Sequence, residues 1–222
     1  MSAATHATEV LAGHRVVPVV VLDDPEKADA LGAALVAGGL PVAEATFRTP
    51  EAAAVLRRLA ARDDLVVGAG TVLTERQVDE ALDAGARFIV SPGLSAGVVR
   101  RCQEAGVPVV PGISTPSEIM QALDLGLDTV KFFPAEANGG LPTIKALAAA
   151  FPQVRFMPTG GITVDSAPAY LAHPSVVAVG GSWMVAGDLL AAGRWDEVAA
   201  RCAATTGLSA PRRTHDLEGA PA

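Results

Sequence analysis

The chain has 222 residues, a net charge of −7 and a mean hydropathy of +0.36, and half of its residues are hydrophobic. This composition supports a packed core and excludes a chain that is disordered over most of its length. The acidic balance argues against a nucleic-acid partner, because phosphate backbones select basic surfaces. Ala, Val and Leu provide most of the apolar content, which suits parallel strands buried on both faces.

Short β-branched runs alternate along the chain with longer Ala- and Leu-rich runs that have helical spacing. The strands are predicted at residues 16–21, 41–46, 65–69, 87–90, 108–110, 129–132, 155–157 and 176–179. The helices are predicted to begin near Pro25, Pro50, Thr74, Ser95, Thr115, Gly140, Thr163 and Ser182, with another helix from about Arg194. Thr115-Pro116, followed by Glu118, has the pattern of a capping box with an N-terminal proline.

Eight strand–helix units predict an α/β fold, a single (β/α)8 TIM barrel. Each unit has roughly 24 residues, which is about the minimum for a strand and its helix. An open, doubly wound sheet is the alternative, but it usually has a glycine fingerprint after its first strand. The first strand here leads into Asp23-Asp24, and Gly68-Ala69-Gly70 lacks the third glycine of that fingerprint.

The barrel is expected over residues 13–206, after an N-terminal arm of residues 1–12. Residues 207–222 lose the helical periodicity and gain Pro, Gly and charge, which predicts a flexible tail. The N-terminus does not resemble a signal peptide, and the apolar runs are too short to span a bilayer. Cys102 and Cys202 fit no zinc or disulfide pattern. We therefore expect a soluble cytoplasmic protein without a membrane partner.

Function in a barrel lies at the carboxyl ends of the strands, where Lys131 is the most informative residue. It is one of only three lysines and lies in an apolar strand, whereas Lys27 and Lys145 lie in helical stretches. Loss of hydration there disfavours the ammonium form, and a neutral amine can attack a carbonyl to form a Schiff base. Alternatively, Lys131 extends to solvent or pairs with a buried carboxylate.

Two further charged residues follow the second predicted strand. Glu44 could shuttle protons beside an imine-forming lysine, or could only form the ion pair that satisfies Lys131. Arg48 could bind a carboxylate through its fork of donors, or could be a solvated loop arginine. Glu136 follows the sixth strand, and we interpret it as a residue that orients its loop rather than as a second acid.

Glycine pairs follow the last two predicted strands. Gly160-Gly161 and Gly180-Gly181-Ser182 could bring backbone N–H groups to a phosphate, in the loops where barrels of this type often bind one. Alternatively, tight turns alone require these glycines. His6, His14, His173 and His215 lie in termini or at helix ends, which argues against a histidine metal site and against a Ser-His-Asp triad.

Eight stretches, covering about residues 14–205, match one family in order. They are Val17-Pro18-Val19, Glu44-Ala45-Thr46-Phe47-Arg48-Thr49, Val67-Gly68-Ala69-Gly70-Thr71-Val72, Ser91-Pro92-Gly93, Pro111-Gly112-Ile113-Ser114-Thr115, Lys131-Phe132-Phe133-Pro134-Ala135-Glu136, Pro158-Thr159-Gly160-Gly161-Ile162 and Gly180-Gly181-Ser182-Trp183. The chain thereby resembles the class I 2-keto-3-deoxy-6-phosphogluconate (KDPG) aldolases, which often also act on 4-hydroxy-2-oxoglutarate (KHG).

The resemblance implies a role for each candidate site residue. Lys131 would form the Schiff base and Glu44 would be the general acid and base. The remaining substrate-binding positions would be Arg48 and Thr71 for the keto-acid carboxylate, Pro92, Phe133 and Thr159 beside them, and Gly160, Gly161 and Ser182 for the phosphate. The resemblance also implies a homotrimer of barrels with neither a metal nor an organic cofactor.

The implied reaction cleaves phosphorylated KDPG into pyruvate and glyceraldehyde 3-phosphate. A galactonate-type substrate is an alternative, because the sequence does not fix the configuration at C4. Other classes are a phosphosugar isomerase or epimerase, a metal-dependent aldolase and a non-catalytic phosphosugar sensor. The sensor is disfavoured because binding alone requires neither Glu44 nor Lys131.

Overall fold

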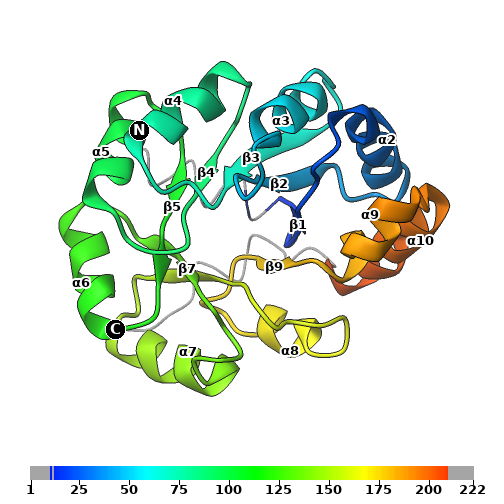
Figure 1. Cartoon of the computed structure of the whole chain (residues 1–222). Coiled ribbons are helices and arrows are strands. Elements are labelled where there is room, and N and C mark those ends of the chain that lie inside the picture. Colours follow the sequence, from blue (N-terminus) through cyan, green and yellow to red (C-terminus); the bar gives the residue numbers. More distant parts are fainter. Residues whose placement is uncertain (1–10, 12, 210–222) are drawn as a thin grey trace.

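The computed structural model describes residue 11 and residues 13–209 (Figure 1). Of the predicted arm of residues 1–12, Leu11 is the one residue that the structure describes, and the others lie outside the described residues. Residues 210–222 of the predicted tail are also outside them. At the start of that tail, a short 3-10 turn extends the last helix and Leu208 packs against the core.

Parallel strands and helices alternate through the described part of the chain. The strands are β1 (Val16–Val20), β2 (Val42–Thr46), β3 (Val66–Gly70), β4 (Ile89–Val90), β5 (Val109–Val110), β6 (Gly112–Ile113), β7 (Thr129–Phe132), β8 (Arg155–Pro158) and β9 (Val179–Gly181). The helices are α2 (Ala28–Ala37), α3 (Ala52–Ala60), α4 (Glu75–Asp83), α5 (Ala96–Glu104), α6 (Pro116–Asp124), α7 (Gly140–Ala150), α8 (Ala167–Leu171), α9 (Gly187–Ala192) and α10 (Trp195–Thr206). Three 3-10 turns complete the order: η1 (Pro25–Lys27), η2 (Trp183–Val185) and η3 (Gly207–Ser209).

The strands form two parallel sheets. One has the order β5-β4-β3-β2-β1-β9 and the other has the order β6-β7-β8. In Figure 1 the helices surround the strands, so the strands form the inner layer of the molecule and the helices form the outer layer. Because all paired strands are parallel, their carboxyl ends and the loops that follow gather at one side of the molecule.

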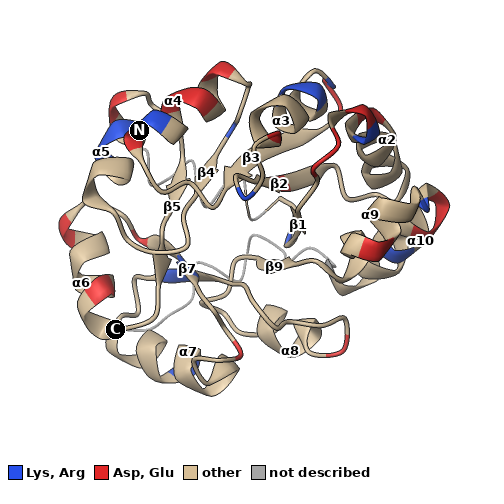
Figure 2. Ribbon diagram, in the orientation of Figure 1, with Lys and Arg blue, Asp and Glu red and all other residues tan. Residues whose placement is uncertain are grey.

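Strand alternation places apolar residues against the helices and two charged residues on the opposite face. Val130 and Phe132 of β7 belong to the large core cluster that the helices cover, and Lys131 lies between them. Ala43 and Ala45 flank Glu44 of β2 in the same way. Figure 2 shows charge mainly on the outer helices and loops, with a basic position on β7.

A smaller apolar cluster fills the face that points away from the helices. Its members are Leu11, Val17, Val42, Phe88, Val90, Val110, Met157 and Ala178. Gly68 of β3 makes room for the largest member, because a Cβ there would lie 2.3 Å from the Phe88 ring. The cluster fills one part of this face with side chains, and Glu44 of β2 and Lys131 of β7 are buried charged residues of the described strands.

The strand bounds differ from the sequence prediction by more than one residue at three places. The predicted eighth strand, residues 176–179, is β9 at Val179–Gly181, because Val176 forms only a single bridge to Phe156 whereas Val179 begins the pairing with β1. Residues 180 and 181 therefore lie in a strand and not in the loop where they were predicted. The fourth strand is shorter than predicted, and Gly112 and Ile113, predicted in a loop, form β6.

The helix starts follow local chemistry. Thr115 and Glu118 form the predicted capping box at α6, where each side chain accepts a backbone N–H of the other residue. The helix predicted near Thr163 begins only at Ala167, because Thr163 and Ser166 first form a hydrogen-bonded turn. Within the described ranges, no helix combines the length and the apolar character that crossing a membrane requires.

Candidate active site

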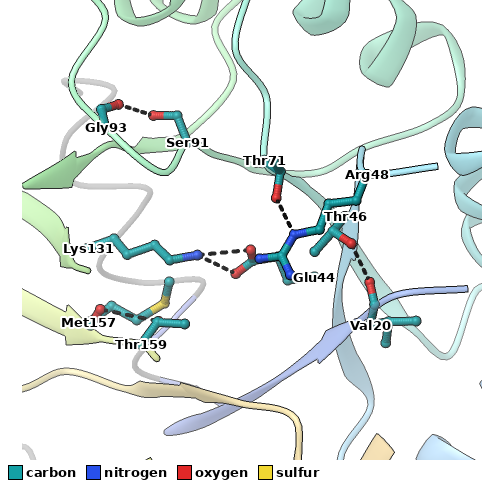
Figure 3. A network of polar contacts seen from close by, with 10 residues as sticks. All are labelled: Val20, Glu44, Thr46, Arg48, Thr71, Ser91, Gly93, Lys131, Met157 and Thr159. Carbon is teal, nitrogen blue, oxygen red and sulfur yellow. Dashed lines mark hydrogen bonds and ion pairs between the residues drawn. The ribbon is translucent and has the colours of Figure 1, made fainter. Parts of the chain in front are cut away.

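The ion pair between Lys131 and Glu44 is the centre of the site (Figure 3). Lys131 Nζ lies 3.0 Å from Glu44 Oε1 and 3.5 Å from Oε2. β7 supplies the lysine and β2 supplies the glutamate, and these residues are 87 positions apart in the sequence. The contact that proton transfer between an amine and a carboxylate requires is therefore present.

The pair is almost completely shielded from water. The Lys131 side chain is 5% exposed and the Glu44 side chain is 0% exposed. Removal of one partner from a buried ion pair leaves an uncompensated charge in the core, which lowers the free energy of unfolding by about 3–5 kcal/mol. The sequence analysis left open whether Glu44 pairs with Lys131 or shuttles protons, and the structure establishes the first without excluding the second.

Gly70 at the end of β3 gives the Glu44 carboxylate its space. A Cβ at position 70 would lie 2.2 Å from Glu44 Oε1, which is closer than two non-bonded atoms can approach. The β2–β3 register, which sets Glu44 opposite Gly68 and Thr46 opposite Gly70, brings this glycine beside the carboxylate. Any side chain at position 70 would displace Glu44 from Lys131.

A second pair, Arg48 and Thr71, lies at the neighbouring ends of β2 and β3 (Figure 3). Arg48 Nε donates a hydrogen bond to Thr71 Oγ1 at 3.2 Å. Thr71 has a φ of +58°, which is uncommon for a β-branched residue and is concentrated at functional sites. Arg48 is exposed, so most of its guanidinium donors remain available to an anion.

A pocket of about 290 Å³ opens at the same strand ends. Its lining residues are Val19, Val21, Arg48, Phe133, Thr159, Gly160, Gly161, Ile162, Gly180, Gly181 and Ser182. Phe133 connects the pocket to the buried ion pair, because Lys131 Nζ lies 5.2 Å from the centre of its ring. Arg48 is the cationic side chain of this lining.

Backbone geometry shapes the glycine side of the pocket. Gly160 and Gly161 have φ values of +102° and +81°, a region that glycine enters without strain. A Cβ at Gly181 would lie 1.8 Å from the Trp183 ring, and the Trp183 indole N–H donates to Thr205 Oγ1 of α10 at 3.1 Å. The last helix thereby fixes the residues on both sides of Ser182.

The predicted site residues fall into one neighbourhood with one exception. Six of them line the pocket: Arg48, Phe133, Thr159, Gly160, Gly161 and Ser182. Lys131 and Glu44 lie beside it, and Thr71 joins it through Arg48. Pro92 does not line the pocket. Its carbonyl lies beside Gly112, which is the β6 neighbour of Lys131.

The sequence analysis missed the apolar walls of the pocket. Val19 of β1, Val21 directly after β1 and Ile162 after β8 line it. The position of residue 21 at the end of the first predicted strand was a signal that could have placed it at the pocket. An apolar side chain, however, has no chemical feature that indicates a binding role. Glu136, which we interpreted as a residue that orients its loop, accepts a hydrogen bond from Tyr170 Oη at 2.6 Å.

Comparison with known proteins gives a consistent result. The family described as "KDPG and KHG aldolase" matches residues 7–201. The KHG/KDPG aldolase of Escherichia coli K12 is 47% identical over 195 residues, which cover 87% of this chain and 92% of that protein.

Two solved structures are similar over nearly the whole chain. The KDPG aldolase of Zymomonas mobilis ZM4, with 3-phosphoglycerate, is 42% identical with a TM-score of 0.87, covering 95% of this chain and 98% of that one. The KDPG aldolase of Legionella pneumophila, with pyruvate captured as a covalent carbinolamine intermediate, is 41% identical with a TM-score of 0.87, covering 90% and 97%. With the site geometry, these matches establish that the chain belongs to the KDPG and KHG aldolase family.

Proposed function

We propose that this protein is a class I aldolase that cleaves KDPG into pyruvate and glyceraldehyde 3-phosphate through a Schiff base on Lys131. The observation that carries the proposal is the buried contact of 3.0 Å between Lys131 Nζ and Glu44 Oε1 beside the pocket. Pyruvate forms a covalent carbinolamine in the Legionella relative. Lys131 is the amine that the pocket of this chain offers to such chemistry, since it lies against Phe133 of the lining.

The reaction starts with proton transfer within the ion pair. Glu44 takes a proton from the Lys131 ammonium, and the neutral Nζ then adds to the C2 carbonyl of the substrate. Glu44 then returns this proton to the C2 hydroxyl of the carbinolamine, and loss of water gives a protonated imine and leaves Glu44 as a carboxylate. This imine is an electron sink for the C3–C4 bond, because the bonding electrons can move into it when that bond breaks.

Glu44 also acts on the bond that is cleaved. Its carboxylate removes the proton of the C4 hydroxyl, directly or through a water molecule, as the C3–C4 bond breaks. Glyceraldehyde 3-phosphate leaves and an enamine of pyruvate remains on Lys131. Protonation of the enamine at C3 and hydrolysis of the imine release pyruvate and restore the amine.

The substrate-binding groups are assigned by their chemistry. Arg48 and Thr71 hold the keto-acid carboxylate, because the guanidinium fork suits a carboxylate. Phe133 and Thr159 of the pocket lining contact the same end of the substrate. Pro92 lies outside the lining, with its carbonyl beside Gly112, the β6 neighbour of Lys131. The backbone of Gly160 and Gly161 and the hydroxyl of Ser182 bind the phosphate at the other end of the pocket.

The phosphate assignment predicts a preference for the phosphorylated substrate. The kcat/KM for KDPG should exceed that for unphosphorylated KHG by at least about tenfold, because remote binding energy stabilises the transition state. Ser182→Ala should reduce this preference and leave the kcat for KHG nearly unchanged. Pyruvate release measured with each substrate, and with the C4 epimer of KDPG, tests both statements. Equal kcat/KM values for KDPG and KHG would refute the phosphate site, and turnover of the epimer alone would identify a galactonate-type enzyme.

The finer architecture is also a proposal. We propose that the two sheets close into a single (β/α)8 barrel over residues 13–206, with residues 1–12 as an arm and 207–222 as a tail. Pro111 alone separates β5 from β6, and its carbonyl accepts the Lys131 N–H at 2.8 Å. On the other side, the bridges Phe156–Val176 and Thr159–Gly180 join the β8 side to the β9 side. The homotrimer and the cytoplasmic location remain predictions from the sequence.

A further inference from the structure

Glu136 and Tyr170 form a hydrogen-bonded pair behind the glycine side of the pocket, and neither residue lines that pocket. Tyr170 belongs to α8 and is 3% exposed, and its hydroxyl donates to Glu136 Oε1 at 2.6 Å. Burial and the Glu136 carboxylate raise the pKa of Tyr170 above its ordinary value. The hydroxyl therefore remains a donor throughout the neutral pH range.

Glu136 is also attached to the glycine loop through its own backbone and side chain. Its N–H donates to the Gly160 carbonyl at 3.0 Å. A Cβ at Gly161 would lie 2.7 Å from Glu136 Cβ and 2.8 Å from its Cγ, so the glutamate side chain packs directly against Gly161. One residue earlier, the Ala135 N–H donates to the Thr159 carbonyl at 2.8 Å.

The same loop leads back to the reacting amine. Glu136 is five residues after Lys131, and Phe133 between them contacts the Lys131 ammonium. A Cβ at Gly160 would lie 3.3 Å from the Phe133 ring, so this ring and the glycine loop are also in contact. Displacement of Glu136 would therefore move the glycine loop first, whereas Lys131 is held independently by the pairing of β7 with β6 and β8.

We propose that Glu136 is a positioning residue for the phosphate end of the pocket, held in place by Tyr170. The Tyr170 hydrogen bond keeps the Glu136 side chain against Gly161, and this contact fixes the directions of the Gly160 and Gly161 N–H groups. The inference rests on the proposed function, because it assigns the phosphate to these glycines. It also assigns a role in substrate selection to Glu136 and Tyr170, which support binding of the phosphate and take no part in the chemistry at Lys131.

Binding measurements test the pair without requiring turnover. Calorimetry would give the Kd of 3-phosphoglycerate and the Kd of pyruvate for the wild type and for Glu136→Ala, Glu136→Gln and Tyr170→Phe. Glu136→Ala should raise the Kd of 3-phosphoglycerate about tenfold, which is the effect of losing one hydrogen bond to a charged group. Its Kd for pyruvate should stay within about twofold, because the pairing of β7 with β6 and β8 holds Lys131 independently of Glu136.

The conservative variant distinguishes positioning from charge. Glu136→Gln retains the side-chain length and can still accept the Tyr170 hydrogen bond, so its Kd for 3-phosphoglycerate should stay within about threefold of the wild type. Tyr170→Phe keeps the buried ring and removes only the hydroxyl. Its Kd for 3-phosphoglycerate should lie between those of Glu136→Gln and Glu136→Ala. Glu104→Ala on α5 serves as the matched control, since Glu104 is an exposed acid that forms an ion pair with Arg101 at 3.7 Å.

Kinetics provide the second readout. With KDPG, Glu136→Ala should raise KM about tenfold and leave kcat within about threefold, while both values for KHG stay near those of the wild type. Equal losses on KDPG and KHG, or an unchanged Kd for 3-phosphoglycerate in Glu136→Ala, would overturn the positioning role. A wild type that binds 3-phosphoglycerate but cleaves no keto acid would instead overturn the proposed function and leave the positioning inference standing or falling on the Kd values.

Discussion

Replacement of Lys131 with alanine should reduce the turnover of KDPG by at least about 10⁴-fold, because no other group can then accept the electrons of the C3–C4 bond. Lys131→Arg should fail equally. A guanidinium stays protonated and is no nucleophile, although it keeps the positive charge beside Glu44. The loss should appear in kcat with both KDPG and KHG, measured as pyruvate release.

Two controls separate lost chemistry from lost structure. Lys145→Ala removes an exposed lysine from α7 and should leave turnover unchanged. Lys131→Arg retains a cation for the buried Glu44, so its thermal unfolding midpoint should stay closer to that of the wild type than the midpoint of Lys131→Ala. Turnover by a folded Lys131→Arg variant within about tenfold of the wild type would refute covalent catalysis at this residue.

Replacement of Glu44 with glutamine should lower kcat by about 10²–10⁴-fold, the usual contribution of a general acid or base. The amide has the shape of the carboxylate and fits the space beside Gly70, but it cannot accept a proton from the C4 hydroxyl. The exchange of the pyruvate methyl protons with deuterated solvent should fall in parallel, since that exchange needs the same base at the enamine stage.

Imine formation distinguishes the two roles that Glu44 can have. If Glu44 is the base of the carbon–carbon step, borohydride should still trap pyruvate on Lys131 of the Glu44→Gln variant after long incubation. The kcat and the rate of methyl exchange of this variant should remain low. If Glu44 serves only as the ionic partner of Lys131, trapping should fall in proportion to kcat. Glu26→Gln is the matched control, because its side chain is 83% exposed and pairs with Arg58 on the surface.

Much of the site could be predicted because chemistry and position coincide in the sequence. Lys131 is conspicuous as a lysine in an apolar strand, and strand alternation then places its side chain on the face of the sheet opposite to that of Val130 and Phe132. Glu44 follows from the same alternation in β2. The glycine pairs were located correctly along the chain, although residues 180 and 181 extend a strand rather than form a loop.

The remaining features depend on tertiary contacts that no local pattern encodes. The bounds of β9 follow from its register with β1, whereas the apolar run at residues 176–179 indicates a strand three residues too early. Glu136 and Tyr170 are 34 residues apart, and nothing in either segment indicates that they meet. Val19 in β1 and Val21 just after it become pocket walls only because β1 ends beside the glycine loops.

Reductive trapping of pyruvate tests the central claim most directly. The protein is incubated with pyruvate and borohydride, digested, and analysed by peptide mass spectrometry, with Lys131→Arg treated in parallel. The account predicts a reduced pyruvate adduct on the peptide that contains Lys131, and no adduct in Lys131→Arg. A folded wild-type protein that cleaves KDPG but yields no adduct, or carries the adduct on Lys27 or Lys145, would contradict Schiff-base catalysis by Lys131.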